Sequence, residues 1–521
     1  MSNFNFITVD SNPKTCQQWI ETIGSVNDYS KAYLSSLNQT QLYPKDTSEA
    51  MMSFVSYLQN AKTNHKKIFI YGDYDSDGVC ATAIAHHLLS QLDIPHGYYI
   101  PNRFSEGYGL NTNRIQQAYD KGYTTLLTVD TGIVAFDHIA FAQQLGMDVL
   151  ISDHHTITQL PNCWVLHPDL MDAPFKGLCG AGVIYELSRH FIQDPLLDCL
   201  AMVATIGDMM QLENENRRIV LHGLAQLKHY RIASIAALLT KVDDVDETAI
   251  AFQVVPKLNA IGRLDDSNPN QLVPYLLNSN DYYCQQGAVQ INAVNQKRKE
   301  LVASTSEHVE VVLNDSIVIA KSDCISSGIV GLVAAQLVGK YKKPSLVFTL
   351  ENGSYKASGR SVEGFDLYHA LSSLNYEHFD SFGGHAGALG CSVAADYFDD
   401  FIQCVKVHCS NWEVVPVSKN VLVIDQHQID DQLMMALQLL KPNDKTHPQP
   451  LFMIKDPHIE KTMVLKGLYP KLVLDNGVEV LSFKVSELNQ LCHSQWIVTL
   501  KPNVFRNKVT IQAMVEEIVR F

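Results

Sequence analysis

Between residues 66 and 210 the sequence alternates short apolar runs with longer stretches of helical pattern. Three of the runs are rich in leucine and β-branched residues, as buried strands of a parallel sheet are: KKIFIY, TTLLTV and MDVLIS. The helical stretches include VCATAIAHHLLSQL and VAFDHIAFAQQLG, and the second ends in a glycine typical of a helix C-cap. Repeated strand–helix units predict an α/β fold with a doubly wound parallel sheet.

Acidic and histidine side chains follow the ends of these predicted strands. Asp75 and Asp77 come after the first run, Asp130 ends the second, and the sequence SDHH at 152–155 ends the third. The carboxyl ends of parallel strands meet at one edge of a sheet, where ligands of such folds bind. We therefore expect these three groups to lie close together. Asp208 follows an apolar helix, so its position is less constrained by this argument.

Clustered carboxylates repel one another unless a cation lies between them. Oxygen ligands suit Mg²⁺ or Mn²⁺, and one imidazole shifts the preference towards Mn²⁺. Four carboxylates around one divalent ion would leave excess negative charge, so two ions are expected. Two metals about 3.5–4 Å apart form a known clamp for phosphoester hydrolysis. The alternative remains that a single aspartate caps a helix, and Asp73 could serve only as such a cap or as a support for a ligand.

The rest of the chain predicts three further regions. Residues 281–313 have one long helical pattern, followed by strands in SIVIAKSD and PSLVFTL around the helix GIVGLVAAQLVGKY. From about 415 onward, KLVLDNGVEVLSFKV and QWIVTLKPNVFRNKVTIQAMVEEI predict hairpins with Asp-Asn-Gly and Arg-Asn turns. We expect an α/β domain with an N-terminal extension at 1–225, a connector at 226–313, a second, smaller α/β domain at 314–412 and a β-rich domain at 413–521.

Charge and cysteine usage narrow the functional class. The net charge of −15 argues against a protein that coats nucleic acid by charge alone, although residues 415–521 carry twelve Lys/Arg against eleven Asp/Glu. The eleven cysteines are scattered without a CxxC pair, which predicts buried thiols in a reducing compartment. No apolar run reaches the ~18–20 residues that span a bilayer, and the start lacks a secretory signal pattern. We expect a cytoplasmic protein with no membrane role.

The motifs GDYDSDG, VDTG, SDHH and TIGDMMQL, in this order, resemble those of the DHH phosphoesterase superfamily. Within it, further segments resemble the RecJ family of single-strand-specific exonucleases, and together they extend over about residues 65–395. These segments are PNRFSEGYGL (101–110), GAGVIYEL (180–187), PKLNAIGRL (256–264), SGIVGLVAAQL (327–337), ASGRSVEGFDL (357–367) and FGGHAGALG (382–390).

The resemblance implies two Mn²⁺ or Mg²⁺ ions in a DHH domain. The metal ligands that it implies are Asp75, Asp77, Asp130, His154 and Asp208. Asp130 would bridge the ions, His155 would contact the scissile phosphate or orient water, and Asp73 would assist them. The nucleic-acid contacts that it implies are Arg103, Tyr108, Arg263, Ser358, Arg360 and His385.

The resemblance also assigns the two C-terminal domains. Residues 314–412 would be the DHH-associated domain, which closes over the metals, and residues 413–521 would be an oligonucleotide-binding (OB-like) β-barrel. This chain departs from the family in three places. It reads LKPNDKTHPQPLF where relatives tend to have a Pro-Phe-Gly…Gly-Asn-Pro-Glu-Pro sequence, it has Tyr71 where some have histidine, and VDTG continues as IVAF.

The implied function is a metal-dependent 5′→3′ exonuclease that degrades single-stranded DNA to mononucleotides in recombination and repair. Its partners would be single-stranded DNA, a single-strand-binding protein and a recombination helicase, and one active site per chain fits a monomer. Two alternatives stay open: a small-substrate DHH phosphodiesterase acting on short oligonucleotides or cyclic dinucleotides, and a scaffold that has lost its metals. The C-terminal ~100 residues disfavour the first, and the five intact ligand positions disfavour the second.

Overall fold

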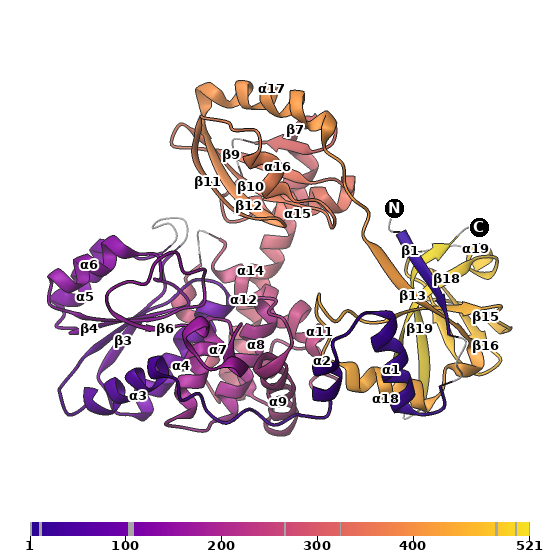
Figure 1. Ribbon diagram of the computed structural model, residues 1–521, viewed down its shortest axis with the longest axis horizontal. Coiled ribbons are helices and arrows are strands. Elements are labelled where there is room, and N and C mark those ends of the chain that lie inside the picture. Colours follow the sequence, from indigo (N-terminus) through magenta and orange to yellow (C-terminus); the bar gives the residue numbers. More distant parts are fainter. Residues whose placement is uncertain are drawn as a thin grey trace. The chain divides into compact units, whose positions relative to one another are not determined.

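The computed structural model describes residues 3–9, 13–102, 109–264, 267–322, 325–484, 488–505 and 508–519. The chain divides into two compact units, coloured along the sequence in Figure 1. The larger unit contains residues 41–210 and 214–415. The smaller unit contains residues 1–40, 211–213 and 416–521. Three segments that are far apart in the sequence therefore make up the smaller unit.

The first sheet of the larger unit has five strands, all parallel, as the sequence predicts. Their order is β3 (His96–Tyr99), β2 (Ile68–Tyr71), β4 (Thr125–Val129), β5 (Asp148–Ser152) and β6 (Trp164–Leu166). The chain leaves β2 for β3 on one side and returns to β4 on the other. This reversal makes the β2–β4 edge a topological switch point, where open α/β sheets bind their ligands.

Helices pack on both faces of this sheet, which makes it doubly wound. One face packs against α5 (Thr112–Asp120) and α6 (Phe136–Gln144) through Ile115, Ile139 and Ala142. The other face lies against α3 (Glu49–Ala61), α4 (Ser76–Gln91) and α7 (Gly180–Arg189). Side chains alternate between the two faces of a strand, and Leu127 of β4 and Leu150 of β5 point to this second face, where the helices bury them.

The next part of the larger unit is helical. Two helices, α8 (Pro195–Gly207) and α9 (Asn214–Tyr230), pack against each other as a hairpin, and α8 also packs on α4. Four short helices follow: α10 (Ala233–Ala236), α11 (Glu247–Ala249), α12 (Val255–Ile261) and α13 (Leu272–Leu276). The predicted long helix is α14 (Asp281–His308), which has 28 residues.

A buried ion network ties α7 to α9. Arg189 Nη1 lies 2.5 Å from Glu186 and 2.9 Å from Glu215, and both glutamate side chains are fully buried. Glu186 and Glu215 also accept hydrogen bonds from the backbone N–H groups of Asp46 and Tyr43. Burial raises the pKa of each glutamate to about 7. The pairing with Arg189 offsets part of the cost of burying these two carboxylates.

The second sheet of the larger unit has six strands, and only the β8–β9 pair is parallel. Its order is β11 (Phe379–His385), β12 (Ala388–Ala394), β10 (Ser354–Arg360), β9 (Ser345–Glu351), β8 (Val318–Lys321) and β7 (Glu310–Asn314). Its helices are α15 (Val330–Tyr341), α16 (Leu367–Ser372) and α17 (Phe398–His408). Strand β7 lies in this sheet, so the sheet begins four residues before the boundary predicted at 314. The prediction missed the antiparallel strands β10, β11 and β12, each of which contains at least one glycine, a residue that is depleted in strands.

The smaller unit contains one sheet of eight strands, in the order β1-β13-β14-β18-β19-β17-β16-β15. Five of them, with the helix α19 (Leu488–Cys492) between the third and fourth, form the OB-like part: β15 (Ile459–Leu465), β16 (Tyr469–Leu474), β17 (Glu479–Leu481), β18 (Gln495–Phe505) and β19 (Lys508–Val519). The two predicted hairpins correspond to the antiparallel pairs β16–β17 and β18–β19. The predicted Arg-Asn turn lies outside the described residues.

The other three strands of this sheet differ from the prediction of a purely β-rich domain. Strands β1 (Asn3–Thr8), β13 (Ser418–Asp425) and β14 (Leu451–Lys455) pair in parallel, and α18 (Asp431–Leu440) connects the last two. The N-terminal segment was expected to extend the first domain, but β1 and the helices α1 (Cys16–Val26) and α2 (Lys31–Ser36) belong to the smaller unit. The physical reason is the apolar face of α1.

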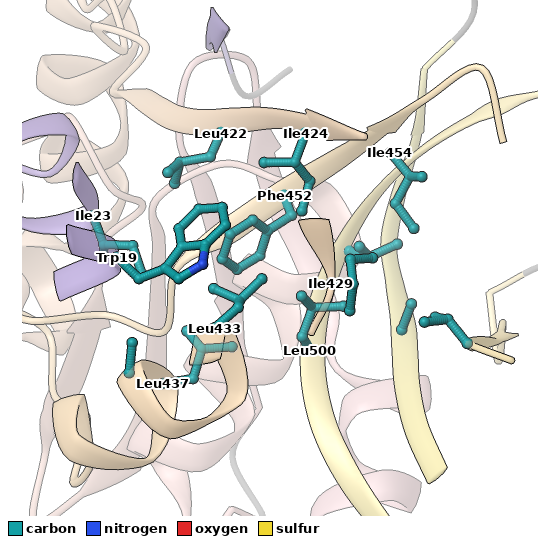
Figure 2. Packing of buried hydrophobic residues seen from close by; sticks show 14 of the residues in the cluster. Trp19, Ile23, Leu422, Ile424, Ile429, Leu433, Leu437, Phe452, Ile454 and Leu500 are labelled. Atoms are coloured by element: carbon teal, nitrogen blue, oxygen red, sulfur yellow. The ribbon is translucent and has the colours of Figure 1, made fainter. Parts of the chain in front are cut away.

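Figure 2 shows this core, in which Trp19 and Ile23 of α1 lie against Leu422, Leu433 and Phe452. Trp19 and Phe452 are fully buried. Burying a tryptophan and an isoleucine contributes several kcal/mol, at about 25 cal/mol per Å² of apolar area. This burial explains why the first 40 residues pack on strands that lie near the end of the sequence. Among the described residues, no helix combines the length and apolar character needed to cross a bilayer.

Candidate metal centre

The loop after β2 presents the first carboxylates. Asp75 is the N-cap of α4, and its Oδ1 accepts hydrogen bonds from the N–H groups of Asp77 and Gly78 at 2.9 and 3.0 Å. The two carboxylate oxygens of Asp77 accept hydrogen bonds from Gly180 and Ala181 at 2.8 and 2.7 Å, at the start of α7. The N-termini of two helices therefore stabilise negative charge at this loop.

Residues of the connector contact the same loop through a hydrogen bond and close packing. Asn259 Oδ1 in α12 accepts a hydrogen bond from the N–H of Ser76 at 2.7 Å. Gly262 packs so closely that a Cβ there would lie 2.6 Å from the Tyr74 carbonyl oxygen. Sequence reasoning assigned no such role to Asn259 or Gly262, because the contact depends on how distant segments pack.

Asp130 follows β4 in the left-handed region of backbone conformation, with φ = 59°. Such a conformation costs a non-glycine residue about 1–3 kcal/mol and is typical of functional sites. Its N–H donates to the carbonyl of Ser152 at 2.9 Å, which fixes the turn against β5. A Cβ on Gly180 would lie 2.5 Å from Asp130 Oδ1, so the absence of a side chain there leaves room for the carboxylate.

The histidine after β5 lies among three carboxylates. His154 Nε2 is 3.2 Å from Asp130 Oδ1, 3.7 Å from Asp77 Oδ2 and 3.8 Å from Asp208 Oδ2. Asp208 is the C-cap of α8, whose packing against α4 brings it to the edge of the sheet. The structure thus brings Asp208, the residue that strand periodicity could not place, to the other predicted ligands.

Asp153 holds the neighbouring histidine in place. Asp153 Oδ1 accepts from the backbone N–H of His154 at 2.7 Å and lies 2.7 Å from His155 Nδ1, while its Oδ2 accepts from the N–H of Ile133. The sequence interpretation noted this aspartate but assigned it no role. The available signal was an aspartate directly before two histidines, since a carboxylate beside an imidazole can fix the orientation of its ring.

The same pair has shifted titration behaviour. The hydrogen bond to Asp153 raises the pKa of His155 to about 9, against the opposing effect of burial. Burial opposes ionisation of Asp153, but the hydrogen bond and charge of His155 hold the pKa of Asp153 below its ordinary value. The His155 side chain is 45% exposed, whereas that of Asp153 is 1% exposed. The imidazole therefore faces the solvent-accessible side of the cluster.

The carboxylates of the cluster are buried and lie close to one another, and both effects oppose their ionisation. Burial and the nearby charges of Asp77 and Asp75 raise the pKa of Asp130. Burial and Asp77 raise the pKa of Asp75, and they raise that of Asp208 to about 7. Burial lowers the pKa of His154, which favours the neutral imidazole that binds metals. Among the described residues, the buried Asp130 Oδ1 makes no hydrogen bond, although His154 lies nearby.

The cluster contains groups whose donor atoms could surround a metal ion. Three sets of ligand atoms each lie within 4.8 Å of one another: Asp73, Asp75 and Asp130; Asp77, His154 and Asp208; and Asp130, His154 and His155. The donors are carboxylate oxygens and imidazole nitrogens, which suit Mn²⁺ or Mg²⁺. Buried mutual repulsion and an oxygen without a hydrogen bond both fit a site that accepts divalent cations. All seven predicted metal and catalytic residues fall in these sets.

Part of the predicted nucleic-acid set gathers near the start of α15. Arg360 Nη1 donates to Ser358 Oγ at 3.0 Å, and Arg263 Nη1 donates to the Gly328 carbonyl at 3.3 Å. A Cβ on Gly331 would lie 2.8 Å from Arg360 Nη2. Two guanidinium groups beside a helix N-terminus make a positive region suited to phosphate.

The remaining members of that set are more scattered. His385 ends β11 and is exposed, and both His385 and Arg360 pair in register with Ala388 of β12. They therefore lie on the same face of the second sheet, on two strands that β12 separates. Arg103 and Tyr108 lie outside the described residues.

Comparison with known proteins gives the family. Residues 67–207 match the DHH family, N-terminal domain, and residues 314–411 match the DHHA1 domain. The chain is 30% identical over 429 residues to the single-stranded-DNA-specific exonuclease RecJ of Haemophilus influenzae, covering 75% of this chain and 73% of that protein. The chain belongs to the RecJ family.

Two other RecJ proteins extend the comparison. RecJ of Bacillus subtilis is 32% identical over 435 residues, which cover 79% of this chain and 55% of that longer relative. The crystal structure of Thermus thermophilus RecJ in complex with Mn²⁺ matches with a TM-score of 0.82 at 21% identity, over 99% of this chain and 80% of that one. The latter likeness shows that this chain has the fold of that protein, including the strand-rich C-terminal part.

Proposed function

We propose that this protein is a metal-dependent exonuclease that degrades single-stranded DNA by hydrolysing its phosphodiester bonds. The observation that carries the proposal is the convergence of carboxylates and histidines at the switch point of the first sheet. Relatives in the RecJ family are named as single-stranded-DNA-specific exonucleases. The polarity, from 5′ to 3′, the release of mononucleotides, the role in recombination and repair and the cytoplasmic location are proposed from the family resemblance.

The metal ligands in this proposal are Asp75, Asp77, Asp130, His154 and Asp208, with Asp130 shared between two Mn²⁺ or Mg²⁺ ions. Asp130 and His154 are each members of two of the three sets of clustered donors, and of these two only Asp130 has a second ligand oxygen with which to bridge two ions. When bound, two such ions activate water and stabilise the attacking and leaving oxygens of a phosphodiester. Asp73 lies in the same set as Asp75 and Asp130, so it either ligates or supports them.

His155 acts on the phosphate in this proposal. Asp153 binds Nδ1 and so fixes the ring, which directs Nε2 away from Asp153. A donor held in this way is suited to a phosphate oxygen, and fixing it before the substrate arrives lowers the cost of orienting it during the reaction. Attack by water at phosphorus forms one P–O bond and breaks the bond to the departing nucleotide.

The DNA strand would be held by the positive region near α15. Arg263 and Arg360 offer planar guanidinium groups that bind phosphate oxygens in pairs, and Ser358 adds a hydroxyl. His385 would contact the same strand, as would Arg103 and Tyr108. The OB-like strands of the smaller unit would also bind single-stranded DNA, and a single-strand-binding protein and a helicase are the proposed protein partners.

The test is digestion of oligonucleotides labelled at either end, with Mn²⁺ or Mg²⁺, by the wild type, Asp130→Ala and Asp137→Ala. Asp137 is a matched control, since it is an exposed aspartate in the first turn of α6. We expect early loss of a 5′ label as mononucleotide, slow attack on blunt duplex, a loss of about 100-fold or more for Asp130→Ala and no loss for Asp137→Ala. Cleavage restricted to dinucleotides or cyclic dinucleotides would instead indicate a small-substrate phosphodiesterase. No cleavage and no metal binding would indicate a scaffold.

A further inference from the structure

Two consecutive residues after β6 hold both ends of the Asp-His-His sequence that follows β5. The N–H of Asp153 donates to the carbonyl of Leu166 at 3.2 Å, which extends the parallel β5–β6 pairing by one bond. The next residue, His167, contacts the other end, because its Nε2 lies 2.9 Å from the carbonyl oxygen of His155. A carbonyl oxygen can only accept, so His167 Nε2 is the donor. The imidazole thus takes the place of a backbone N–H, which the following Pro168 lacks.

His167 is itself fixed in one orientation and one tautomer. Its side chain is buried, with 3% exposed. The backbone N–H of Asp169 donates to His167 Nδ1 at 3.1 Å, so Nδ1 carries no proton and Nε2 carries one. The exposed carboxylate of Asp169 lies 3.8 Å from the same nitrogen, which is beyond hydrogen-bond distance. The carbonyl of His167 also accepts from the N–H of Leu170 at 2.8 Å, so the donor at Nε2 is held on a fixed backbone.

Asp153 alone does not fix His155 against rotation. Asp153 Oδ1 accepts from the backbone N–H of His155 at 3.2 Å and lies 2.7 Å from its ring Nδ1. Both bonds meet at one oxygen atom, so they permit residue 155 to turn about that oxygen. The bond from His167 acts at a third point of the residue, its carbonyl oxygen, and therefore restricts this rotation.

The segment after His155 gives this bond its importance. Residues 156–160 lie outside helices and strands, and all of them except Ile157 are exposed. In the part of the chain that the structure describes, no hydrogen bond reaches the backbone of these residues. Segments with exposed backbone and few contacts open most readily. The bond between His167 and the His155 carbonyl therefore separates the Asp-His-His sequence from the motion of the segment that follows it.

We propose that His167 is a positioning residue for His155: its bond to the carbonyl oxygen holds the His155 imidazole where it acts on the phosphate. This inference rests on the proposed function, in which His155 contacts the phosphate. It concerns His155 and not the metal ligands, because Asp153 Oδ1 separately accepts from the N–H of His154 at 2.7 Å. Loss of the bond should lower the rate of cleavage and leave Mn²⁺ binding unchanged.

Two substitutions of His167 separate its two hydrogen bonds. The amide nitrogen of glutamine lies about as far along the side chain as Nε2 of histidine. His167→Gln therefore keeps a donor for the His155 carbonyl but offers no acceptor to the N–H of Asp169. The asparagine side chain is shorter, and its Oδ1 replaces Nδ1. His167→Asn therefore remains an N-cap of the short helix η1 (Pro168–Leu170) but loses the donor to His155.

The test measures kcat and KM on an end-labelled single-stranded oligonucleotide with Mn²⁺, together with Mn²⁺ titrations and thermal melts of the full-length variants. We expect His167→Asn to lower kcat about tenfold, the low end of the loss typical of residues that support a metal site, with unchanged KM, Mn²⁺ affinity and melting temperature. His167→Gln, the conservative variant, should rescue most of the kcat and melt at a lower temperature. His190→Asn is the matched control, because His190 Nε2 also lies 3.0 Å from a backbone carbonyl, that of Asp46. It should melt at a lower temperature and keep the wild-type kcat.

The outcomes distinguish a positioning role from a structural one. A wild-type kcat in His167→Asn would overturn the inference, and so would a loss of Mn²⁺ affinity in that variant. A kcat that falls in step with the melting temperature across all three variants would also overturn it. His155→Ala separates these results from failure of the proposed function. If His155→Ala cleaves at the wild-type rate, the proposed role of His155 fails first. If His155→Ala is slow and His167→Asn is not, the role of His155 stands and the positioning role falls.

Discussion

Substituting Gly180 by alanine should disrupt the metal centre through a single methyl group. Gly180 is the first residue of α7, and a Cβ there would lie 2.5 Å from both Cβ and Oδ1 of Asp130. The N–H of Gly180 also donates to Asp77 at 2.8 Å. The methyl group would therefore push on one proposed ligand while the backbone of the same residue holds another.

The size of the effect follows from these distances. Ordinary van der Waals contact begins near 3.4 Å, so Asp130 and the new Cβ must move about 1 Å apart. Overpacking of this kind costs about 1–3 kcal/mol, and the better helix propensity of alanine returns at most about 1 kcal/mol. The free energy of unfolding should thus fall by up to about 3 kcal/mol, while a displacement of about 1 Å in a catalytic group can lower the rate roughly 100-fold. Because a 100-fold loss of rate corresponds to about 2.7 kcal/mol, the effects on activity and on stability should be of similar size.

The assay compares nuclease rates, Mn²⁺ affinity and chemical denaturation of Gly180→Ala with those of Gly339→Ala. Gly339 is the matched control, since it lies exposed in the helix α15 and a Cβ there would meet no atom within 4 Å among the described residues. We expect Gly339→Ala to keep full activity and to be more stable by about 0.5–1 kcal/mol. The reasoning is refuted if Gly180→Ala folds and keeps both the wild-type rate and the wild-type Mn²⁺ affinity.

Three further predictions concern charge. Asp153→Asn should lower the pKa of His155 from about 9 towards 6.5 in the chelated protein, because the largest cause of the shift is the hydrogen bond to Asp153; an NMR titration that still gives a value near 9 would contradict this. Arg189→Met should cost about 3–5 kcal/mol by leaving buried carboxylates unpaired. The pKa of Glu186 is already higher in the folded state than in the unfolded state, so the loss of unfolding free energy caused by Arg189→Met should grow as pH rises from 5 to 8. Denaturation curves that give equal losses at both pH values would refute this prediction. Because burial raises the pKa of Asp208 to about 7, protons compete with Mn²⁺ below that pH, and Mn²⁺ affinity measured by titration should rise between pH 6 and 8. A Mn²⁺ concentration one hundred times the Kd should stabilise the fold by about 2.7 kcal/mol, which thermal melts would measure.

The edge of the first sheet was predictable because local pattern and a general rule agree there. Asp130 ends a run that forms β4, and His154 follows a run that forms β5, and the parallel β4–β5 pair brings them together. Asp208 could not be placed in this way, since its position depends on how α8 packs against α4. The family resemblance supplied it, and the structure brings it within 3.8 Å of His154.

Other features had no local signal at all. The parallel pairing of Asn3 with Ser418 joins strands that are more than 400 residues apart, and each strand alone predicts nothing about the other. The glycines around His385 are divided between the strand β11, which contains Gly383 and Gly384, and the turn to β12, which contains Gly387. The contact of Asn259 with Ser76 likewise depends on tertiary packing. Long-range pairing and close packing are therefore what the sequence patterns could not specify.

The parallel β1–β13 pair has a consequence for synthesis of the protein on the ribosome. Residues 1–40 emerge first, but the strands that cover them follow only after roughly 375 further residues. At translation rates of about 5–20 residues per second, Trp19 and Ile23 stay exposed for roughly 20–75 s before the strands that bury them are synthesised. During that time the exposed apolar surface can bind other chains. The smaller unit cannot complete its sheet until β18 and β19 have been synthesised. Nascent chains of this protein should therefore engage chaperones through their N-terminal helix, and a chain released early should aggregate through it.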